Sequence, residues 1–338
     1  MKRPWLRPLV PLYAAGAAMR SAALRYGLEP VRRLRWPVVS IGNLSAGGAG
    51  KTPFTMALAR LLLHEGIYVD VLSRGYGRKS HEIERVNTSG TAEQFGDEPL
   101  LIARRIGLPV YVGAQRYRAG RLAEREANSK TGVHLLDDGF QHRQLARQVD
   151  IVLVNSEDLS DALLPAGNLR EKSTALKRAG VLAVAAGDDA AVERLRELGF
   201  GPQSDQPIWR YSRAMVVPEI PESLLARPVV AFCGIARPEQ FFAGLAEKGF
   251  KVAATRTFPD HHPFTRGDVA MLRRLLEATG SGALVTTAKD LFRMGDLATT
   301  LDLADPIFSV DLEVVFEDEA GIAHWLRRAL GPAADGAA

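Results

Sequence analysis

Residues 38–52 read Val-Val-Ser-Ile-Gly-Asn-Leu-Ser-Ala-Gly-Gly-Ala-Gly-Lys-Thr. The apolar, β-branched start predicts a strand over 38–41, the glycine-rich middle predicts a loop, and a helical pattern follows over 56–63. Strand, glycine-rich loop, Lys-Thr and helix form the order of a phosphate-binding P-loop. Glycines let successive backbone N–H groups face phosphate oxygens, and the positive end of the helix dipole adds to the attraction.

The nucleotide-binding residues predicted from this register are Gly47, Gly48, Ala49, Gly50, Lys51 and Thr52. Lys51 is expected to reach the β- and γ-phosphates, and the Thr52 hydroxyl is expected to bind Mg²⁺. The strict P-loop pattern has a glycine where this chain has Ser45. The alternative is a glycine-rich turn with a chance Lys-Thr, but both the strand before it and the helix after it favour the P-loop.

Length and composition describe an ordinary soluble globular chain. Its 338 residues favour two domains, with 46% hydrophobic and 24% charged residues. Cys233 is the single cysteine, so no disulfide can form within the chain, which favours a reducing compartment. Because Cys233 ends an apolar run, we expect a buried, inert thiol.

Positive charge is concentrated at the N-terminus. Residues 1–36 carry eight Lys or Arg and one Glu, a net charge of +7, so the remaining chain carries −3 of the total +4. A nucleic-acid-binding domain would carry its charge over a folded face, so no nucleic-acid partner is expected.

Residues 1–36 predict a basic, amphipathic helix that lies on a membrane surface. Trp5, Leu9, Leu12 and Met19 are among its apolar residues, and Arg7 and Arg20 leave 12 uncharged residues between them. Spanning a bilayer takes about 20 apolar residues, so an interfacial helix fits better than a transmembrane one. The alternative is a helix docked on the protein's own core.

Strand and helix patterns alternate along the rest of the chain. Strands are predicted over 68–72, 110–112, 133–136, 150–154, 180–185, 208–217, 228–232, 251–255, 283–287 and 307–316. Helices are predicted near 99–103 and over 116–127, 191–198, 238–247, 267–278 and 321–330. This alternation predicts an α/β fold with a mostly parallel sheet. Prolines and glycines cluster at 201–221, which predicts a P-loop domain over 37–206, a linker over 207–226, a second α/β domain over 227–330 and a disordered tail over 331–338.

Asp137 and Asp138 end an apolar strand, as in a Walker B motif. Ligands bind at the carboxyl edge of open α/β sheets, and Mg²⁺ prefers carboxylate, hydroxyl and phosphate oxygens. We therefore expect Asp137 or Asp138 to join Thr52 at the metal, and the pattern does not distinguish the two.

Two further segments hold candidate acid–base groups. Asp97 lies in the turn Gly-Asp-Glu-Pro before a helix, where capping of that helix is the simpler explanation. His261 lies in the segment Asp-His-His between Pro259 and Pro263. Adjacent histidines rarely face one ion, so a carboxylate-orienting histidine or a plain loop is favoured over a metal site.

Five arginines follow predicted strands or precede predicted helices. Each alone is most often a solvated charge, but together they could line a pocket for a phosphorylated substrate through bidentate contacts. They are Arg74, Arg78, Arg116, Arg143 and Arg170.

A set of motifs over nearly the whole chain resembles the tetraacyldisaccharide 4′-kinase (lipid A 4′-kinase) family. The matching segments, in family order, are 42–53 (GNLSAGGAGKTP), 73–78 (SRGYGR), 96–99 (GDEP), 137–142 (DDGFQH), 164–171 (LPAGNLRE), 232–238 (FCGIARP), 258–261 (FPDH) and 286–290 (TTAKD). The family pattern shares the serine at position 45.

The resemblance implies ATP- and Mg²⁺-dependent transfer of the γ-phosphoryl group to the 4′-hydroxyl of a tetraacylated glucosamine disaccharide 1-phosphate, forming a lipid A precursor. It implies a P-loop NTPase-like α/β/α domain and a smaller α/β/α domain, joined by a two-stranded linker. It places the protein peripherally on the cytoplasmic face of the inner membrane, with no protein partner expected. It also implies that Asp97 and His261, from different domains, form a catalytic pair. Lys51 of the P-loop is the third residue expected to be catalytic.

Two other classes remain to be weighed. A membrane-associated P-loop ATPase of the partitioning or transport type would have a signature lysine where this chain has Ala46. A GTP-binding regulatory module would have an Asn-Lys-x-Asp segment, whereas residues 287–290 read Thr-Ala-Lys-Asp. Both alternatives are disfavoured by these departures.

Overall fold

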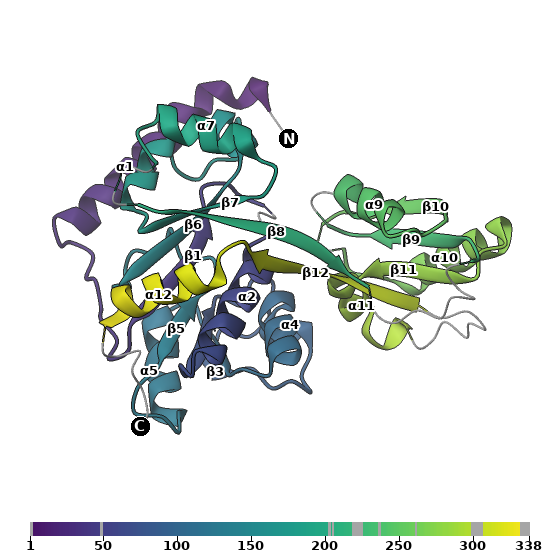
Figure 1. The fold of residues 1–338 in the computed structure, drawn as a ribbon, viewed down its shortest axis with the longest axis horizontal. Helices are drawn as coiled ribbons and strands as arrows, with labels where there is room; N and C mark the ends of the chain where they lie inside the picture. The colour runs from purple at the N-terminus through teal and green to yellow at the C-terminus, as the bar shows by residue number, and fades with distance from the viewer. Residues whose placement is uncertain are drawn as a thin grey trace. The chain divides into compact units, whose positions relative to one another are not determined.

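The computed structural model describes residues 3–47, 50–201, 204, 206–217, 226–235, 238–260, 262–298 and 307–331. The chain forms two compact units, one of Met1–Arg213 with Val314–Ala338 and one of Ala214–Glu313 (Figure 1). Both have the predicted α/β organisation, with helices against a largely parallel sheet. Within the described ranges, no helix combines the length and the apolar character needed to cross a membrane.

The sheet of the first unit has the order β8-β7-β6-β1-β5-β2-β4-β3. Its pairs are parallel except for β3 with β4. The strands are β1 (Val38–Asn43), β2 (Val69–Ser73), β3 (Glu84–Arg85), β4 (Val110–Val112), β5 (Val133–Leu136), β6 (Val149–Val154), β7 (Val181–Ala185) and β8 (Ile208–Val216). Central parallel strands are covered on both faces, which is why β1, β2 and β5 are buried along their whole length.

Helices and short 3₁₀ turns connect these strands. They are η1 (Pro4–Leu9), α1 (Val10–Arg25), α2 (Lys51–His64), α3 (Ala92–Phe95), α4 (Asp97–Ile106), α5 (Arg116–Glu126), α6 (Ser156–Ser160), η2 (Ser173–Arg178), α7 (Asp189–Glu197) and α12 (Glu319–Leu330). Because the carboxyl ends of parallel strands meet at one edge, the loops after β1, β2 and β5 converge there.

The closing helix differs from its expected place. The sequence assigned residues 321–330 to the second domain, but α12 belongs to the first unit. Trp325 packs edge-on against Trp209 of β8 at 5.6 Å between ring centroids. The Arg327 guanidinium lies 2.7 Å from the Glu65 carboxylate at the end of α2. The amphipathic pattern of α12 predicts a buried face but does not identify the sheet that buries it.

The N-terminal helix α1 docks on the first unit. Val10, Tyr13 and Ala14 pack against an apolar cluster that includes Leu44 and Leu169. The docked arrangement left open from the sequence is therefore present. The opposite side of the N-terminal segment remains apolar and exposed, because Trp5, Leu12 and Met19 are each at least 69% exposed.

The second unit has a parallel sheet of order β10-β9-β11-β12. Its strands are β9 (Val229–Cys233), β10 (Val252–Thr257), β11 (Ala283–Thr287) and β12 (Ile307–Phe316), and its helices are α9 (Pro238–Glu247), α10 (Arg266–Thr279), α11 (Ala288–Met294) and η3 (Gly295–Ala298). Apolar clusters form on both faces of β9, around Phe232 on one side and Phe241 on the other. Cys233 is buried and free, and burial raises the pKa of its thiol to about 12.

β8 and β12 are neighbouring strands, and each contains a boundary between the two units. They form the predicted two-stranded linker. Part of the linker segment expected from the sequence, residues 218–225, lies outside the described residues, as does the expected disordered tail beyond residue 331.

Candidate active site

The P-loop register places Lys51 at the first turn of α2. Gly50 caps this helix in the left-handed region with φ of +78°, a conformation that favours glycine. The Lys51 ammonium donates to the Asn43 side-chain oxygen at 2.9 Å and lies 3.4 Å from an Asp138 oxygen. Gly48 and Ala49 lie outside the described residues. A cation therefore lies beside the helix N-terminus, where phosphates bind in P-loop proteins.

Ser45, the departure from the strict P-loop pattern, has a structural reason. Its hydroxyl donates to an Asp158 carboxylate oxygen at 2.8 Å and accepts from the Asn43 side-chain amide at 2.9 Å. Asn155 also donates to Asp158, at 3.1 Å. Asn43, Ser45 and Asp158 are buried, and Asn155 is partly buried. Sequence reasoning assigned no role to Asn43 or Asp158. Asp158 could not be found from local patterns, because it is 113 positions from Ser45.

Ser45→Gly, which restores the strict P-loop glycine, is expected to destabilise the protein by about 1–3 kcal/mol, because the buried Asp158 carboxylate and Asn43 amide lose a partner. Denaturant unfolding measures the change. Ser89→Gly, in an exposed turn, controls for the entropic cost of a new glycine. Equal losses in the two variants would show that the Ser45 hydroxyl does not stabilise the loop.

Asp137 and Asp138 follow β5, which pairs with β1 through Ser40 and Leu136. Asp137 is buried and accepts from the Thr55 hydroxyl of α2 at 3.3 Å. Burial, followed by the nearby Glu98 and Asp138 carboxylates, raises its pKa to about 7. Burial acts to raise the pKa of Asp138 as well, but Lys51 and Arg170 outweigh it and the pKa is lowered.

The turn at Asp138 is tightly packed. Asp138 has φ of +50° and is the one non-glycine residue with positive φ among those described. Such strain is held in place by surrounding contacts and clusters at functional sites. A Cβ on Gly42 would lie 2.5 Å from the Phe140 Cβ, so only glycine lets β1 approach this turn.

Three of the five predicted arginines gather near this turn. The Arg170 guanidinium contacts both Asp138 oxygens, at 3.0 and 3.1 Å. Arg116 is 6% exposed, and burial and the charge of Arg74 lower its pKa to about 10, while Asp138 and Asp137 oppose the shift. His142, which sequence reasoning did not single out, has a pKa lowered to about 3. Burial is the largest cause, followed by the positive charges of Arg116, Arg147, Arg20 and Arg74.

The other two arginines make different contacts. Arg78 pairs with Glu84 of β3 at 3.3 Å and donates to the Glu82 carbonyl. Arg143 donates to the Ser21 hydroxyl of α1 at 3.1 Å. Both guanidiniums are thus engaged with parts of the protein itself.

Asp97 begins α4, directly after Gly96 at φ of +90°. A Cβ on Gly96 would lie 3.0–3.1 Å from the backbone of Gly75 and Tyr76, so this turn packs closely against the loop that carries Arg74. Its neighbour Glu98 raises the pKa of Asp137, so the start of α4 lies within electrostatic range of that carboxyl group. His261 lies outside the described residues, while His262 in the second unit bonds Asp268 at 3.1 Å.

The donor set can be tested against Mg²⁺. In the described part of the chain, no three His, Cys, Asp or Glu residues are grouped to hold a metal ion. Mg²⁺ in phosphotransfer sites is typically bound by one or two carboxylates together with substrate phosphates. Thr52, Asp137 and Asp138 supply hard oxygen donors of that kind, so they fit a metal that arrives with a nucleotide.

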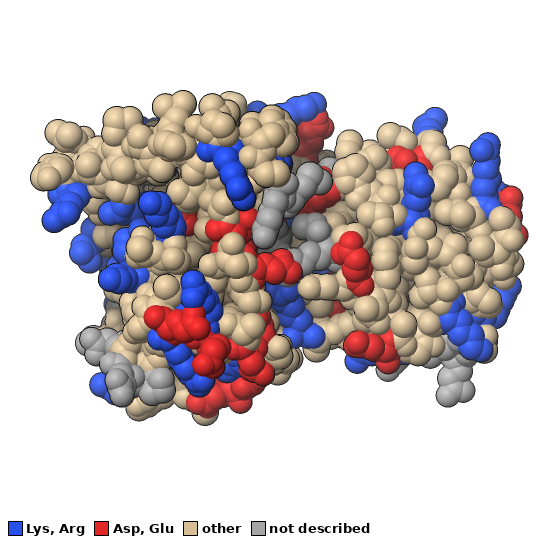
Figure 2. Space-filling view, turned by 90° about the horizontal axis from the view of Figure 1, so that it is seen from above, with Lys and Arg blue, Asp and Glu red and all other residues tan. Residues whose placement is uncertain are grey.

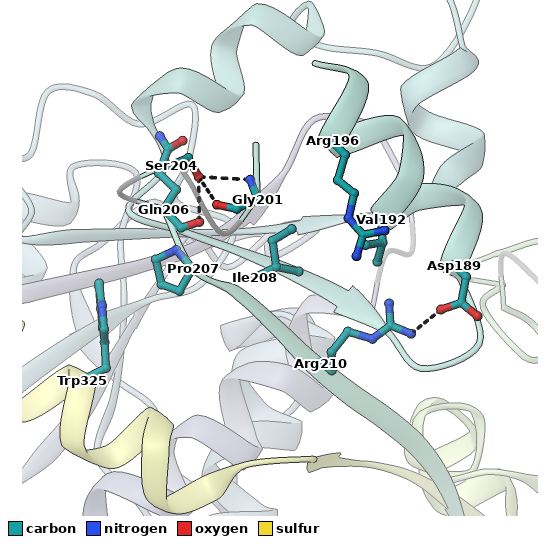
Figure 3. A pocket seen from close by; sticks show the side chains of 10 residues that line it. All are labelled: Asp189, Val192, Arg196, Gly201, Ser204, Gln206, Pro207, Ile208, Arg210 and Trp325. Atoms are coloured by element: carbon teal, nitrogen blue, oxygen red, sulfur yellow. Dashed lines mark hydrogen bonds and ion pairs between the residues drawn. The ribbon is translucent and has the colours of Figure 1, made fainter. Parts of the chain in front are cut away.

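A separate cavity of about 720 Å³ lies between α7, β8 and α12 (Figure 3). Its lining residues are Asp189, Val192, Arg196, Gly201, Ser204, Gln206, Pro207, Ile208, Arg210 and Trp325. Arg210 pairs across it with Asp189 at 2.9 Å. None of these residues belongs to the P-loop or to the Asp137–Asp138 turn, so this cavity is not the candidate nucleotide site.

The site combines a P-loop lysine, two carboxylates that directly follow the neighbouring parallel strand β5, and a group of arginines. These features are typical of a nucleotide-dependent phosphotransferase of the P-loop class. The chain belongs to the tetraacyldisaccharide-1-P 4′-kinase (LpxK) family, whose model matches residues 2–331.

Relatives named tetraacyldisaccharide 4′-kinase support this assignment. The protein from Koribacter versatilis is 44% identical over 93% of this chain and 95% of its own length. The protein from Geobacter metallireducens is 35% identical over 90% and 92%. The crystal structure of LpxK from Aquifex aeolicus in complex with ATP aligns with a TM-score of 0.76 and 32% identity, over 96% of this chain and 98% of that one. These similarities do not favour the partitioning-type ATPase.

Proposed function

We propose that this protein transfers the γ-phosphoryl group of ATP to the 4′-hydroxyl of a tetraacylated glucosamine disaccharide 1-phosphate. The observation that carries the proposal is the placement of Lys51 and Asp138 within 3.4 Å at the start of α2, in a chain that belongs to the 4′-kinase family. A lysine at a P-loop and a carboxylate at the end of a neighbouring strand are recurring parts of phosphoryl-transfer sites in P-loop proteins.

Each group has a role that follows from its environment. Lys51 stabilises the negative charge that builds on the transferred phosphoryl group. Thr52 with Asp137 or Asp138 would hold Mg²⁺, which neutralises phosphate charge when bound. Lys51 and then Arg170 lower the pKa of Asp138, and the Arg170 guanidinium contacts both of its carboxylate oxygens. Asp97 is proposed to accept the proton of the sugar hydroxyl, with His261 orienting it.

The acceptor carries a phosphate of its own, and the arginines supply positive charge for it. Arg170 contacts Asp138, and Arg74, Asp138 and Asp137 all act on the pKa of the buried Arg116, so the three arginines gather near the Asp138 turn. We assign these three arginines to the acceptor phosphate or to the nucleotide. Arg78 and Arg143, engaged with Glu84 and Ser21, are assigned to holding the loops that carry the site.

We propose that the N-terminal segment meets a membrane surface, at the cytoplasmic face of the inner membrane, because a substrate with four acyl chains resides in a bilayer. Figure 2 shows the molecule from above, which is the side on which α1 lies in Figure 1. A broad area of this side has no charged side chains, and Lys and Arg side chains lie beside it. Trp5, Leu12 and Met19 are exposed on this segment. An apolar face with a basic border suits an interfacial helix.

Leu12→Ser with Met19→Ser is expected to weaken binding to anionic vesicles by at least about tenfold. These side chains face away from the core at 74% and 69% exposure, so their loss removes apolar area available to the bilayer and leaves the docked face unchanged. Co-sedimentation with vesicles at low salt measures the effect. The matched control is Leu63→Ser with Val315→Ser, two partly exposed apolar residues elsewhere in the first unit. Equal binding by both double variants would contradict the assignment of this face.

A panel of nucleotides, with and without the acylated disaccharide, tests the proposed function. The expected result is consumption of ATP only when the acceptor is present. ATP hydrolysis at the same rate with and without the acceptor would indicate an ATPase. A requirement for GTP in place of ATP would indicate a GTP-binding regulatory module.

A further inference from the structure

The N-terminal segment, including helix α1, contacts the loop of residues 161–172, which is hydrogen-bonded to the P-loop. The Tyr13 hydroxyl donates to the Arg170 carbonyl oxygen at 3.1 Å, and the Arg3 amide donates to the Ala166 carbonyl at 2.7 Å. The Tyr13 ring also packs against the apolar cluster of Leu44, Leu163 and Leu169. The attachment therefore combines a specific polar bond with apolar packing.

The same loop is bonded to the first residues of the P-loop. The Arg170 amide donates to the Leu44 carbonyl at 2.7 Å, and the Ala46 amide donates to the Asn168 carbonyl at 2.8 Å. Ser45 and Leu169 form an antiparallel bridge between these two bonds. A shift of the Arg170 backbone would thus move the backbone of residues 44–46, which leads to Lys51.

Arg170 extends the connection to the Asp138 turn. Its guanidinium contacts both Asp138 oxygens and donates to the Gln141 side-chain oxygen at 3.1 Å. Asp138 in turn lies 3.4 Å from the Lys51 ammonium. One residue therefore joins α1 through its carbonyl, the P-loop through its amide and the acidic turn through its side chain.

We propose that Tyr13 is a positioning residue for phosphoryl transfer: its hydroxyl fixes the Arg170 backbone, and Arg170 holds the Asp138 carboxylate beside Lys51. Tyr13 bonds to Arg170 and acts on Asp138 and Lys51 through that residue. The inference rests on the proposed function, since it assigns Asp138 and Lys51 to the reaction. Helix α1 would then help to position the Asp138 carboxylate, in addition to docking on the first unit.

Tyr13→Phe removes only the hydroxyl and tests the proposal. We expect kcat per active site to fall about two- to tenfold, the effect of one lost hydrogen bond, with KM for ATP within twofold of wild type and a higher Mg²⁺ concentration at half-maximal rate. The matched control is Tyr68→Phe, which removes the hydroxyl of another half-buried tyrosine, next to β2 and at its amino end. An unchanged kcat and Mg²⁺ dependence in Tyr13→Phe, with an active wild-type enzyme, would overturn the proposal. Absence of transfer by the wild-type protein would instead overturn the proposed function.

A double-mutant cycle separates positioning from general loosening. In an Arg170→Lys background, where the contacts to Asp138 are altered, the Tyr13→Phe substitution should change kcat by less than about 1.5-fold. The same factor in both backgrounds would show that Tyr13 does not act through Arg170. Hydrogen exchange gives a readout independent of turnover: amides of residues 44–46 and 163–171 should exchange faster in Tyr13→Phe and not in Tyr68→Phe. Unchanged exchange in those segments would also overturn the proposal.

Discussion

Lys51→Ala is expected to lower kcat for phosphoryl transfer about 10²–10³-fold, the cost of removing one preorganised donor from a developing charge. The Lys51 ammonium is held by the Asn43 side chain at 2.9 Å, and its side chain is 11% exposed. It therefore approaches a phosphate without first having to be ordered. The α2 dipole remains after the substitution, but the positive charge proposed to contact the β- and γ-phosphates is lost.

Steady-state kinetics with saturating ATP and acylated acceptor measure this loss. Lys79→Ala is the matched control, since Lys79 is an exposed lysine paired with Glu93, outside the P-loop. Thermal unfolding should show both variants folded. Retention of more than about a tenth of the wild-type kcat in Lys51→Ala corresponds to less than about 1.4 kcal/mol and would contradict the P-loop assignment.

Asp97→Asn is expected to lower kcat about 10²–10⁴-fold while changing ATP affinity little, because a sugar hydroxyl needs a positioned base to become a nucleophile. Asp97 begins α4, whose first turn also brings Glu98 near Asp137. Rapid-quench measurement of the transfer step, together with equilibrium binding of ATP, separates chemistry from binding. Asp189→Asn, at a carboxylate that is 87% exposed, is the control. A kcat within tenfold of wild type would remove Asp97 from the role of base.

His261→Ala tests the second member of the proposed pair. If Asp97 and His261 act as one unit, the double variant should be little slower than the slower single variant. His64→Ala, at an exposed histidine on α2, controls for general effects of histidine loss. Losses that multiply fully would show that the two residues act independently.

The sequence predicted the central strands and the P-loop because their signals are local. The β-branched runs of β1 and β5 identify buried parallel strands, and the carboxyl ends of neighbouring strands necessarily meet. This rule was sufficient to predict that Lys51 and Asp138 lie at the same edge of the sheet, where they are 3.4 Å apart. Shorter elements escaped prediction: α3 and α6 have four and five residues, too few to show a helical period. A signal for α6 was present in Asn155, whose side chain caps the Asp158 amide.

The supporting contacts of the site could not be predicted from local patterns. Ser45 meets Asp158 across 113 positions, and Tyr13 meets Arg170 across 157. Nothing in the surrounding residues specifies such a partner, because hydroxyl–carboxylate and hydroxyl–carbonyl bonds depend on tertiary geometry. The placement of α12 in the first unit has the same origin, since its apolar stripe does not specify which sheet buries it. Burial likewise makes Arg116 part of the site interior, although arginines are mostly exposed.

The most direct test of the central claim is the position of the transferred phosphate. The purified protein is incubated with γ-labelled ATP, Mg²⁺ and a tetraacylated glucosamine disaccharide 1-phosphate in mixed micelles, and the product is analysed by mass spectrometry and ³¹P NMR. The account predicts one labelled phosphate monoester at the 4′-oxygen, with the 1-phosphate unchanged and with label transfer by Lys51→Ala slower by at least about 10²-fold. Label released only as inorganic phosphate, or attached to the 1-phosphate as a diphosphate, would contradict it.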